Sequence, residues 1–340
     1  MVLRQRGARL LDEVERSEEM SNCEGISASR ATHKSSFMKR RGIIITGATG
    51  SGKSKRALEI ADDIKKIGQE CVIINCDAMQ IYKELPIITA QPDAADMAKT
   101  EHLMYGFRSI FEEEKYSVGK YLQDLRATID ALDRECIPIV VGGSMMYVEA
   151  IIEGIDEIPE IEATKLIEMR NFFEKKSTQE LFQILVKKDK KYADFLLGKD
   201  SSTNRQKIMR ALEVVGATGK SIMDFWGQRR QLFNDFQFEK YITNLDRERL
   251  YEKINKRFDK MLLEGALEEA KTVHEKAKKN NYEEVKKMLP KVIGLREFFD
   301  YFDGLITLDT AIEEAKQASR RYAKRQLTWF RNRFISFETI

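Results

Sequence analysis

A glycine-rich segment at residues 47–54 has the residue types of a phosphate-binding loop. It reads Gly-Ala-Thr-Gly-Ser-Gly-Lys-Ser and fits the pattern GxxxxGK[ST]. Glycines let successive backbone amides turn toward phosphate oxygens, and a helix that follows adds the positive end of its dipole. An ordinary glycine-rich turn would not require the glycines, the lysine and the serine to stand at the positions that this eight-residue pattern fixes. The candidate phosphate-binding residues are Gly47, Ala48, Thr49, Gly50, Ser51, Gly52, Lys53 and Ser54, and the Ser54 hydroxyl is also a candidate ligand for Mg²⁺.

Two further polar side chains follow predicted strands. Asp77 comes after the apolar run 71–75, and Ser144 comes after the run 137–141 and two glycines. Ligands of open parallel sheets bind beyond the carboxyl ends of the strands, so we expect the loop, Asp77 and Ser144 to share one edge. Asp77 has the chemistry of a general base, a metal ligand or a helix N-cap, and its spacing does not decide among them. Ser144 is either a donor to developing negative charge or a turn serine.

The elements that must position these residues form the start of a parallel α/β sheet. A β-branched run at 43–46 precedes the loop, and a helical pattern at 53–67 follows it and ends at Gly68. The strand at 71–75 completes a β-loop-α-β unit. A second helical pattern, 118–134, precedes the strand at 137–141.

Strand signals fade beyond Pro159. Residues 160–232 read almost wholly as helices, and helices resume after a short β-like stretch at 240–244 until about Asn332. The predicted fold class is α/β, a P-loop NTPase-like parallel sheet core with a helical insertion and a helical C-terminal part. The predicted divisions are a disordered extension at 1–37, a core formed by 38–158 and 239–340, and a helical insertion domain at 159–238.

Composition narrows the class of protein. The formal net charge is only +3 over 340 residues, so a nucleic-acid site must come from local clustering of charge. The four cysteines are scattered, which favours a reducing compartment and gives no zinc-finger spacing. No apolar run reaches the roughly 18 residues of a membrane span. Residues 1–37 are too rich in acids for a transit peptide and lack a signal-peptide core, so we expect a cytoplasmic protein.

A basic cluster marks the C-terminal part. Residues 316–333 contain no acid and seven basic residues, namely Lys316, Arg320, Arg321, Lys324, Arg325, Arg331 and Arg333. Helical spacing puts Arg320, Lys324 and Arg331 on one face, which we expect to bind RNA phosphates. The interleaved aromatics Tyr322, Trp329 and Phe330 either stack on bases or pack in the core, and the core is favoured. A shorter basic run at 187–191 is either an RNA-stem contact or a solvated face.

Taken in order, these motifs resemble those of the tRNA dimethylallyltransferases, also called tRNA isopentenyltransferases. The resemblance runs across nearly all of residues 42–333. It is carried by GATGSGKS at 47–54, DAMQIY at 77–82, TAQP at 89–92, IPIVVGGSMMYV at 137–148, QKIMRALEV at 206–214, KVIGLR at 291–296 and KRQLTWFR at 324–331. The chain departs from the family pattern at Gln91 (usually lysine), Met145 (glycine), Ser144 (threonine) and Lys253, the first of two expected arginines, of which the second is Arg257.

The resemblance implies transfer of a dimethylallyl group from dimethylallyl diphosphate to N6 of the tRNA adenosine 3′-adjacent to the anticodon, with release of diphosphate. It implies Mg²⁺ as cofactor and the catalytic residues Asp77, Ser144 and Arg257, with Lys253 as a further phosphate ligand. We expect a monomer. The implied tRNA-binding residues are Asp77, Ala78, Met79, Gln80, Gln206, Lys207, Arg210, Arg296, Lys324, Arg325, Gln326, Thr328, Trp329 and Arg331.

Three other functions are weighed against this one. An adenylate isopentenyltransferase acting on free AMP would not need the basic C-terminal helix. A P-loop kinase or ATPase would carry an acid at the strand end where this chain has Gly142. An RNA-binding module without catalysis would not need Lys53, Ser54 and Asp77 together. Transfer to tRNA is therefore the favoured hypothesis.

Overall fold

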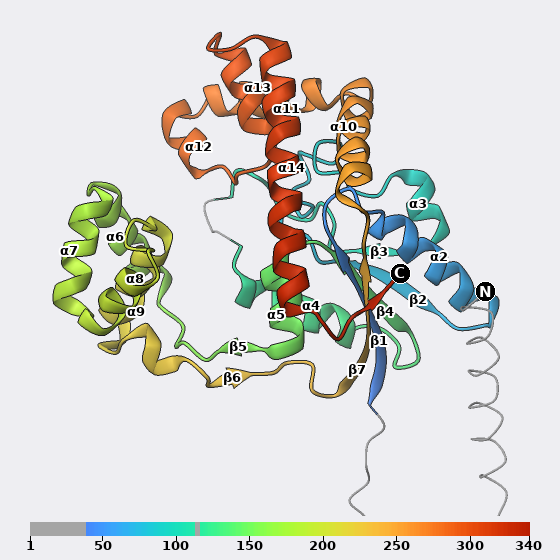
Figure 1. Ribbon diagram of the computed structural model, residues 1–340, viewed down its shortest axis with the longest axis horizontal. Coiled ribbons are helices and arrows are strands. Elements are labelled where there is room, and N and C mark those ends of the chain that lie inside the picture. Colours follow the sequence, from blue (N-terminus) through green and yellow to red (C-terminus); the bar gives the residue numbers. More distant parts are fainter. Residues whose placement is uncertain (1–38, 113–115) are drawn as a thin grey trace, which may run out of the picture. The chain divides into compact units, whose positions relative to one another are not determined.

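A six-stranded parallel sheet forms the centre of the protein. The computed structural model describes residues 39–112 and 116–340 (Figure 1), so the prediction for residues 1–37 lies outside its described part. The strand order is β3-β2-β4-β1-β7-β8. The strands are β1 (Arg40–Gly47), β2 (Cys71–Asn75), β3 (His102–Leu103), β4 (Ile137–Gly142), β7 (Phe236–Thr243) and β8 (Glu338–Thr339). The predicted parallel α/β core is confirmed.

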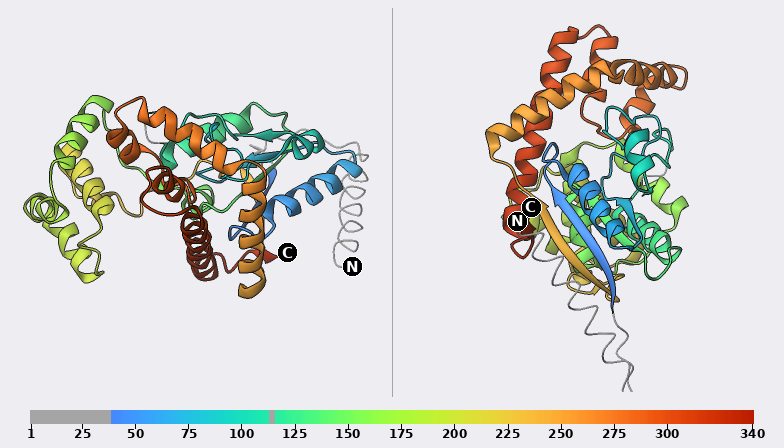
Figure 2. Two further views of the ribbon diagram at one scale, coloured as in Figure 1. Left: turned by 90° about the horizontal axis from the view of Figure 1, so that it is seen from above. Right: turned by 90° about the vertical axis from the view of Figure 1, so that its right-hand side faces the viewer.

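Helices cover both faces of this sheet, which explains why its central strands are apolar on both sides. Ile43 and Ile45 of β1 pack against α2 (Lys53–Lys66). Ile44, between them, packs on the opposite face with α4 (Val118–Asp130) and α5 (Met145–Glu153). Figure 2 shows β7 running beside β1, in a register that pairs Ile43 with Glu239. The two strands lie far apart in sequence, and β7 pairs in turn with β8 near residue 340, so the sheet joins both ends of the described chain.

The insertion is a helical unit with a core of its own. Its elements are α6 (Ala163–Glu174), α7 (Thr178–Lys188), α8 (Lys190–Gly198), α9 (Arg205–Thr218) and the 3₁₀ helix η1 (Ile222–Phe225). Leu181, Leu185 and Leu212 are buried in its centre. The chain leaves and returns through a two-stranded antiparallel ribbon, in which β5 (Ile155–Asp156) pairs with β6 (Arg229–Arg230). Arg229 and Arg230 thus belong to a strand, whereas the sequence predicted helices up to residue 232. The domain boundaries near residues 159 and 238 stay a prediction.

The C-terminal part is helical, as predicted, and packs around aromatic residues. Its helices are α10 (Arg247–Leu263), α11 (Ala266–Lys278), α12 (Tyr282–Met288), α13 (Leu295–Phe302) and α14 (Leu308–Arg333), and the short α3 (Ala94–Lys99) precedes β3. Phe258, Phe298 and Phe299 fill the cluster between them. The two-residue strands β3 and β8 carry no sequence signal, and α4 ends at Asp130, before the expected Arg134. Within residues 39–112 and 116–340, no helix combines the length and apolarity needed to cross a bilayer.

Candidate active site

The phosphate loop joins the end of β1 to the first turn of α2. Gly52 has a φ of 96°, a left-handed conformation that suits glycine and lets the helix begin at Lys53. The Lys53 side chain folds back over the loop and donates to the Ala48 carbonyl oxygen at 3.0 Å. Burial lowers the pKa of Lys53 to about 8; the charge of Asp77 opposes this shift and that of Arg257 adds to it. The negative charge of a bound phosphate would favour the protonated form of Lys53, against the effect of burial.

Contacts within the protein hold this loop in shape. The Ser51 amide donates to the Ala48 carbonyl at 3.1 Å. The Ser51 hydroxyl lies 2.6 Å from that of Thr243 on β7, and the Thr49 amide donates to the Gln326 side-chain oxygen of α14 at 2.8 Å. The loop is thus fixed by a neighbouring strand and by the C-terminal helix. Such preorganisation lowers the entropy cost of binding a phosphate.

Asp77 lies at the adjacent strand end, as the topology predicted. Its carboxylate accepts from the Met79 amide at 3.0 Å and from the Gly143 amide. This is a local Asx turn, and the next regular helix is α3, so the helix N-cap interpretation is wrong. Burial raises the pKa of Asp77, while these amides and the charges of Lys53 and Arg257 oppose the increase. A carboxylate with raised basicity, aimed by two amides, is suited to accept a proton.

Ser144 and Arg257 reach the same region from two other elements. The Ser144 hydroxyl accepts from the Ala78 amide at 2.8 Å, which leaves its hydrogen to donate elsewhere. Arg257 of α10 donates to the Thr49 hydroxyl of the phosphate loop at 2.6 Å. Burial lowers its pKa, and Asp77 opposes this, yet a guanidinium stays charged. Lys253, one turn earlier on α10, is exposed. Of the two cations that the sequence offered here, Arg257 is the one that contacts the loop.

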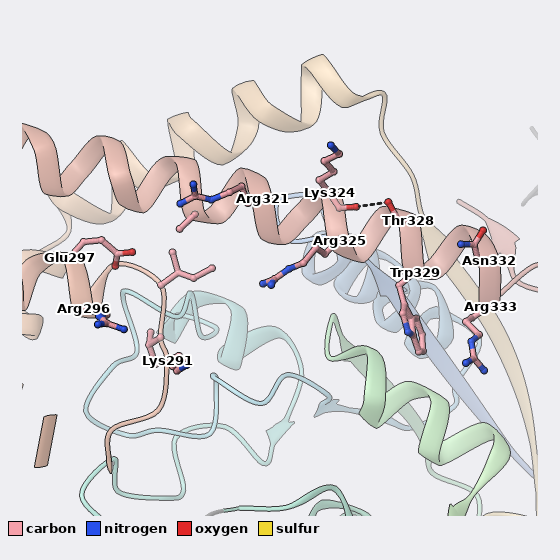
Figure 3. Close-up of a pocket in the computed structure, with 13 residues that line it drawn as sticks. Lys291, Arg296, Glu297, Arg321, Lys324, Arg325, Thr328, Trp329, Asn332 and Arg333 are labelled. Carbon is pink, nitrogen blue, oxygen red and sulfur yellow. Dashed lines mark hydrogen bonds between the residues drawn. The ribbon is translucent and has the colours of Figure 1, made fainter. Parts of the chain in front are cut away.

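A basic groove runs along α14 (Figure 3). It has a volume of about 880 Å³ and lies between the helix and residues 291–297. Its basic lining residues are Lys291, Arg296, Arg321, Lys324, Arg325 and Arg333, and Glu297 is its acidic lining residue. Thr328, Trp329 and Asn332 complete the helical side. Predicted RNA-binding residues from two separate motifs therefore line one surface.

The basic face of α14 differs from the one that helical spacing predicted. Arg320 donates to Asn255 of α10 at 2.7 Å, and Lys316 pairs with Asp259 of α10 at 2.6 Å. Both side chains tie α14 to α10 and are not among the residues that line the groove. Arg331 is exposed. The first basic residue of α14 that lines the groove is instead Arg321, one residue after Arg320.

The aromatic residues of α14 divide between core and groove. Phe330 is fully buried, as favoured from the sequence. Trp329 lines the groove while its ring packs edge-on against Phe334, with a centroid distance of 5.1 Å. The Arg333 guanidinium lies 5.8 Å from the centroid of the same ring. Trp329 is thus held in a fixed orientation with part of its surface available.

The structure distributes the other predicted tRNA-binding residues over several elements. Gln206, Lys207 and Arg210 are exposed on α9 of the insertion. Ala78 and Met79 are half-buried beside Asp77. Gln80 donates to the Thr89 and Ala90 carbonyls at 3.1 and 2.6 Å, which closes the loop after β2.

Three residues have places that the motifs did not indicate. Gln326 is fully buried and bonded to the phosphate loop, not turned toward the groove. Tyr105 and Tyr322 lie near Asp77: burial raises the pKa of both hydroxyls, and the Asp77 charge raises it further. No motif marks Tyr105, and Tyr322 was visible only as an aromatic within the basic stretch.

The donor set fits a magnesium ion bound together with a phosphate. Ser54 is exposed in the first turn of α2, next to Lys53. In the part of the chain that is described, no three His, Cys, Asp or Glu side chains gather in a metal-binding cluster. Mg²⁺ commonly takes one protein oxygen plus substrate phosphates and water, so one hydroxyl at the loop suffices. The site fits an ion that arrives with its substrate.

Comparisons with known proteins agree with this geometry. Residues 80–333 match the family model described as IPP transferase. The chain is 39% identical over 308 residues to a tRNA dimethylallyltransferase of Wolbachia pipientis wMel, which covers 89% of this chain and 96% of that protein. It is 38% identical over 296 residues to one of Bartonella quintana, covering 86% and 93%.

Two solved structures are also similar to this chain. One is a full-length tRNA isopentenylpyrophosphate transferase from Bacillus halodurans, with a TM-score of 0.58, 28% identity, and coverage of 89% of this chain and 90% of that one. The other is a eukaryotic dimethylallyltransferase acting on tRNA, with a TM-score of 0.69, 27% identity, and coverage of 86% and 70%.

Proposed function

This chain belongs to the IPP transferase family, and we propose that it transfers a dimethylallyl group from dimethylallyl diphosphate to an adenosine of tRNA. The observation that carries the proposal is the meeting of three features. A phosphate loop, a half-buried carboxylate and a basic groove converge around α14, which bonds to the loop through Gln326 and lines the groove with Arg325. A phosphate donor and an RNA acceptor thus have adjoining sites.

Asp77 acts as the general base in this reaction. The exocyclic N6 amine of the adenosine attacks the allylic carbon that bears the diphosphate, a C–N bond forms, and the C–O bond to diphosphate breaks. The amine gains positive charge as it attacks, and its proton passes to the Asp77 carboxylate. The amides of Met79 and Gly143 hold that carboxylate in one orientation. A positioned base of this kind contributes about 100- to 10 000-fold to a rate.

The phosphate loop stabilises the departing diphosphate. Negative charge grows on it as the C–O bond breaks, so fixed donors nearby favour the transition state over the bound substrate. Lys53 and Arg257 supply positive charge, and the Ser144 hydroxyl supplies a hydrogen. Mg²⁺, held by Ser54 and the diphosphate, would add Lewis-acid stabilisation when bound. Lys253 is exposed on the same helix as Arg257 and has at most a steering role.

The tRNA lies along the groove beside α14. Lys324, Arg325 and Arg296 contact phosphates, and Trp329 offers a ring face for a base. The acceptor adenosine, 3′-adjacent to the anticodon, turns out of its stack toward Asp77, at a cost that is smaller in a single-stranded loop. The exposed residues of α9 are proposed contacts for a more distant part of the tRNA. The cytoplasmic location and the monomeric state stay predictions.

Transfer of radiolabelled dimethylallyl diphosphate to unmodified tRNA tests the proposal. We expect label in tRNA, and none when the adenosine beside the anticodon is replaced by another base. Parallel reactions contain AMP, or ATP labelled in its γ-phosphate. Label in AMP alone would identify a free-nucleotide prenyltransferase. Release or transfer of the γ-phosphate without prenyl transfer would identify a kinase or ATPase.

A further inference from the structure

One buried side chain connects the helix of the basic groove to the two loops of the active site. Gln326 of α14 is fully buried. Its amide oxygen accepts from the Thr49 amide of the phosphate loop at 2.8 Å, and its amide nitrogen donates to the Gly143 carbonyl at 2.7 Å. It also forms a hydrogen bond with the Tyr322 hydroxyl, one turn earlier on α14. Both the oxygen and the nitrogen of the Gln326 side-chain amide therefore form hydrogen bonds.

The contact at Gly143 leads directly to the proposed base. The Gly143 amide donates to the Asp77 carboxylate, while its carbonyl accepts from Gln326. A Cβ atom on Gly143 would lie only 2.6 Å from the Gln326 nitrogen, so a larger residue at position 143 would displace the Gln326 side chain from this contact. Gln326 thus fixes both the phosphate loop, at Thr49, and the residue that orients Asp77.

The opposite direction leads to the groove. Arg325 and Lys324, which immediately precede Gln326, line the groove on α14. A helix moves as a rigid element. RNA phosphates that bind Lys324 and Arg325 therefore also change or stabilise the position of Gln326. Packed interfaces switch between discrete arrangements and do not deform continuously. A change in the position of α14 therefore alters the hydrogen bonds of Gln326 to the loops at Thr49 and Gly143.

We propose that Gln326 is a positioning residue that couples tRNA binding in the groove to diphosphate binding in the phosphate loop. This rests on the proposed function above. Glutamine suits the role because it offers one acceptor for Thr49 and one donor for Gly143. Glutamate would keep the acceptor and lose the donor, and methionine would keep a similar volume and lose both. By linkage, each substrate then changes the affinity of the other by the same factor.

The test compares dissociation constants on the full chain. Binding of dimethylallyl diphosphate is measured alone and with saturating tRNA whose acceptor adenosine is replaced by guanosine, so that no transfer occurs. For the wild type we expect tighter binding with tRNA, by about 5- to 150-fold, the usual range of allosteric coupling. In Gln326→Met the ratio should fall toward 1, while tRNA alone binds within about threefold of the wild-type affinity. Gln317→Leu, an exposed glutamine on the same helix, is the matched control and should keep the wild-type ratio.

Gln326→Glu provides a second, independent variant in case the methionine variant folds poorly. It keeps the Thr49 contact and loses the Gly143 contact, so we expect kcat to fall by at least tenfold with the KM for dimethylallyl diphosphate within about threefold. A general loss of folding would not separate kcat from KM in this way. A wild-type ratio of 1, a wild-type ratio kept in Gln326→Met, or a wild-type kcat in Gln326→Glu would overturn the inference. A wild-type enzyme that transfers no label to normal tRNA would overturn the proposed function itself, which is a different result.

Discussion

The lowered pKa of Lys53 predicts how diphosphate binding depends on pH. Burial in the phosphate loop brings this pKa from 10.5 to about 8. A bound diphosphate places negative charge next to the ammonium group and favours its charged form, so binding raises the pKa again. Above pH 8 the free protein has lost the proton and must take one up to bind. Affinity should therefore weaken as the pH rises.

The size of the effect follows from the two pKa values. If the bound diphosphate restores the ordinary pKa of 10.5, the affinity falls about tenfold for each pH unit between about 8 and 10.5. If the bound diphosphate raises the pKa of Lys53 by less than this, the affinity falls over a narrower pH range, but it still falls as the pH rises. Titration of the ligand does not contribute in this pH range, because a phosphate loses its second proton near pH 6. Burial raises the pKa of the neighbouring Cys76 thiol to about 12, which is above this window.

Titration calorimetry of dimethylallyl diphosphate without tRNA measures this dependence. Between pH 7 and 9.5, buffers with different ionisation enthalpies should report an uptake approaching one proton at the upper end. Lys53→Arg is the matched control, because a guanidinium keeps its charge throughout and should remove the uptake. An affinity that stays constant from pH 7 to 9.5, or proton uptake that persists in Lys53→Arg, would refute the reasoning.

Four further outcomes are expected. Asp77→Asn should lower kcat by about 100- to 10 000-fold with tRNA affinity unchanged in a filter-binding assay; near-normal turnover would exclude it as the base. Arg257→Ala should lower kcat/KM by about 100- to 1000-fold, whereas Lys253→Ala should change it by less than about threefold, and equal losses would contradict the assignment. Arg325→Ala should reduce the slope of log tRNA affinity against log salt by about 0.7 to 0.9, and an unchanged slope would remove it from the RNA surface. Phe298→Ala should cost about 3–5 kcal/mol of unfolding free energy in urea titrations, since the ring is fully buried, and a cost below 1 kcal/mol would show that the site collapses.

The residues nearest the phosphate site could be predicted because local chain geometry determines their places. The loop 47–54 follows a buried strand and opens a helix, and Asp77 and Ser144 follow neighbouring strands of the same sheet. In a parallel sheet, strand ends meet at one edge whatever the rest of the chain does. Sequence order alone therefore brought these groups together.

The contacts made by the C-terminal helices could not be predicted in the same way. Helical spacing relates Arg320 to Lys324, but it does not say which side of α14 faces α10. Gln326 reads as one polar residue in a basic motif, and only tertiary packing reveals that it bonds to Thr49. The strands β3 and β8 have two residues each, too short for a periodic pattern. Long-range packing decided each of these features.

The pairing of β1 with β7 has a consequence for synthesis on the ribosome. The ion pair between Arg41 and Glu239 joins residues 198 positions apart, so the edge of β1 that binds β7 stays open while all the residues between are being made. The insertion, whose core draws on residues 158–225, contains only local partners and can fold within that interval. An exposed strand edge is a template for unwanted pairing, and the nascent chain carries one until β7 emerges. Chaperones that bind nascent chains at the ribosome, and slowed translation, should therefore affect the yield of this enzyme mainly in the interval between the synthesis of β1 and that of β7.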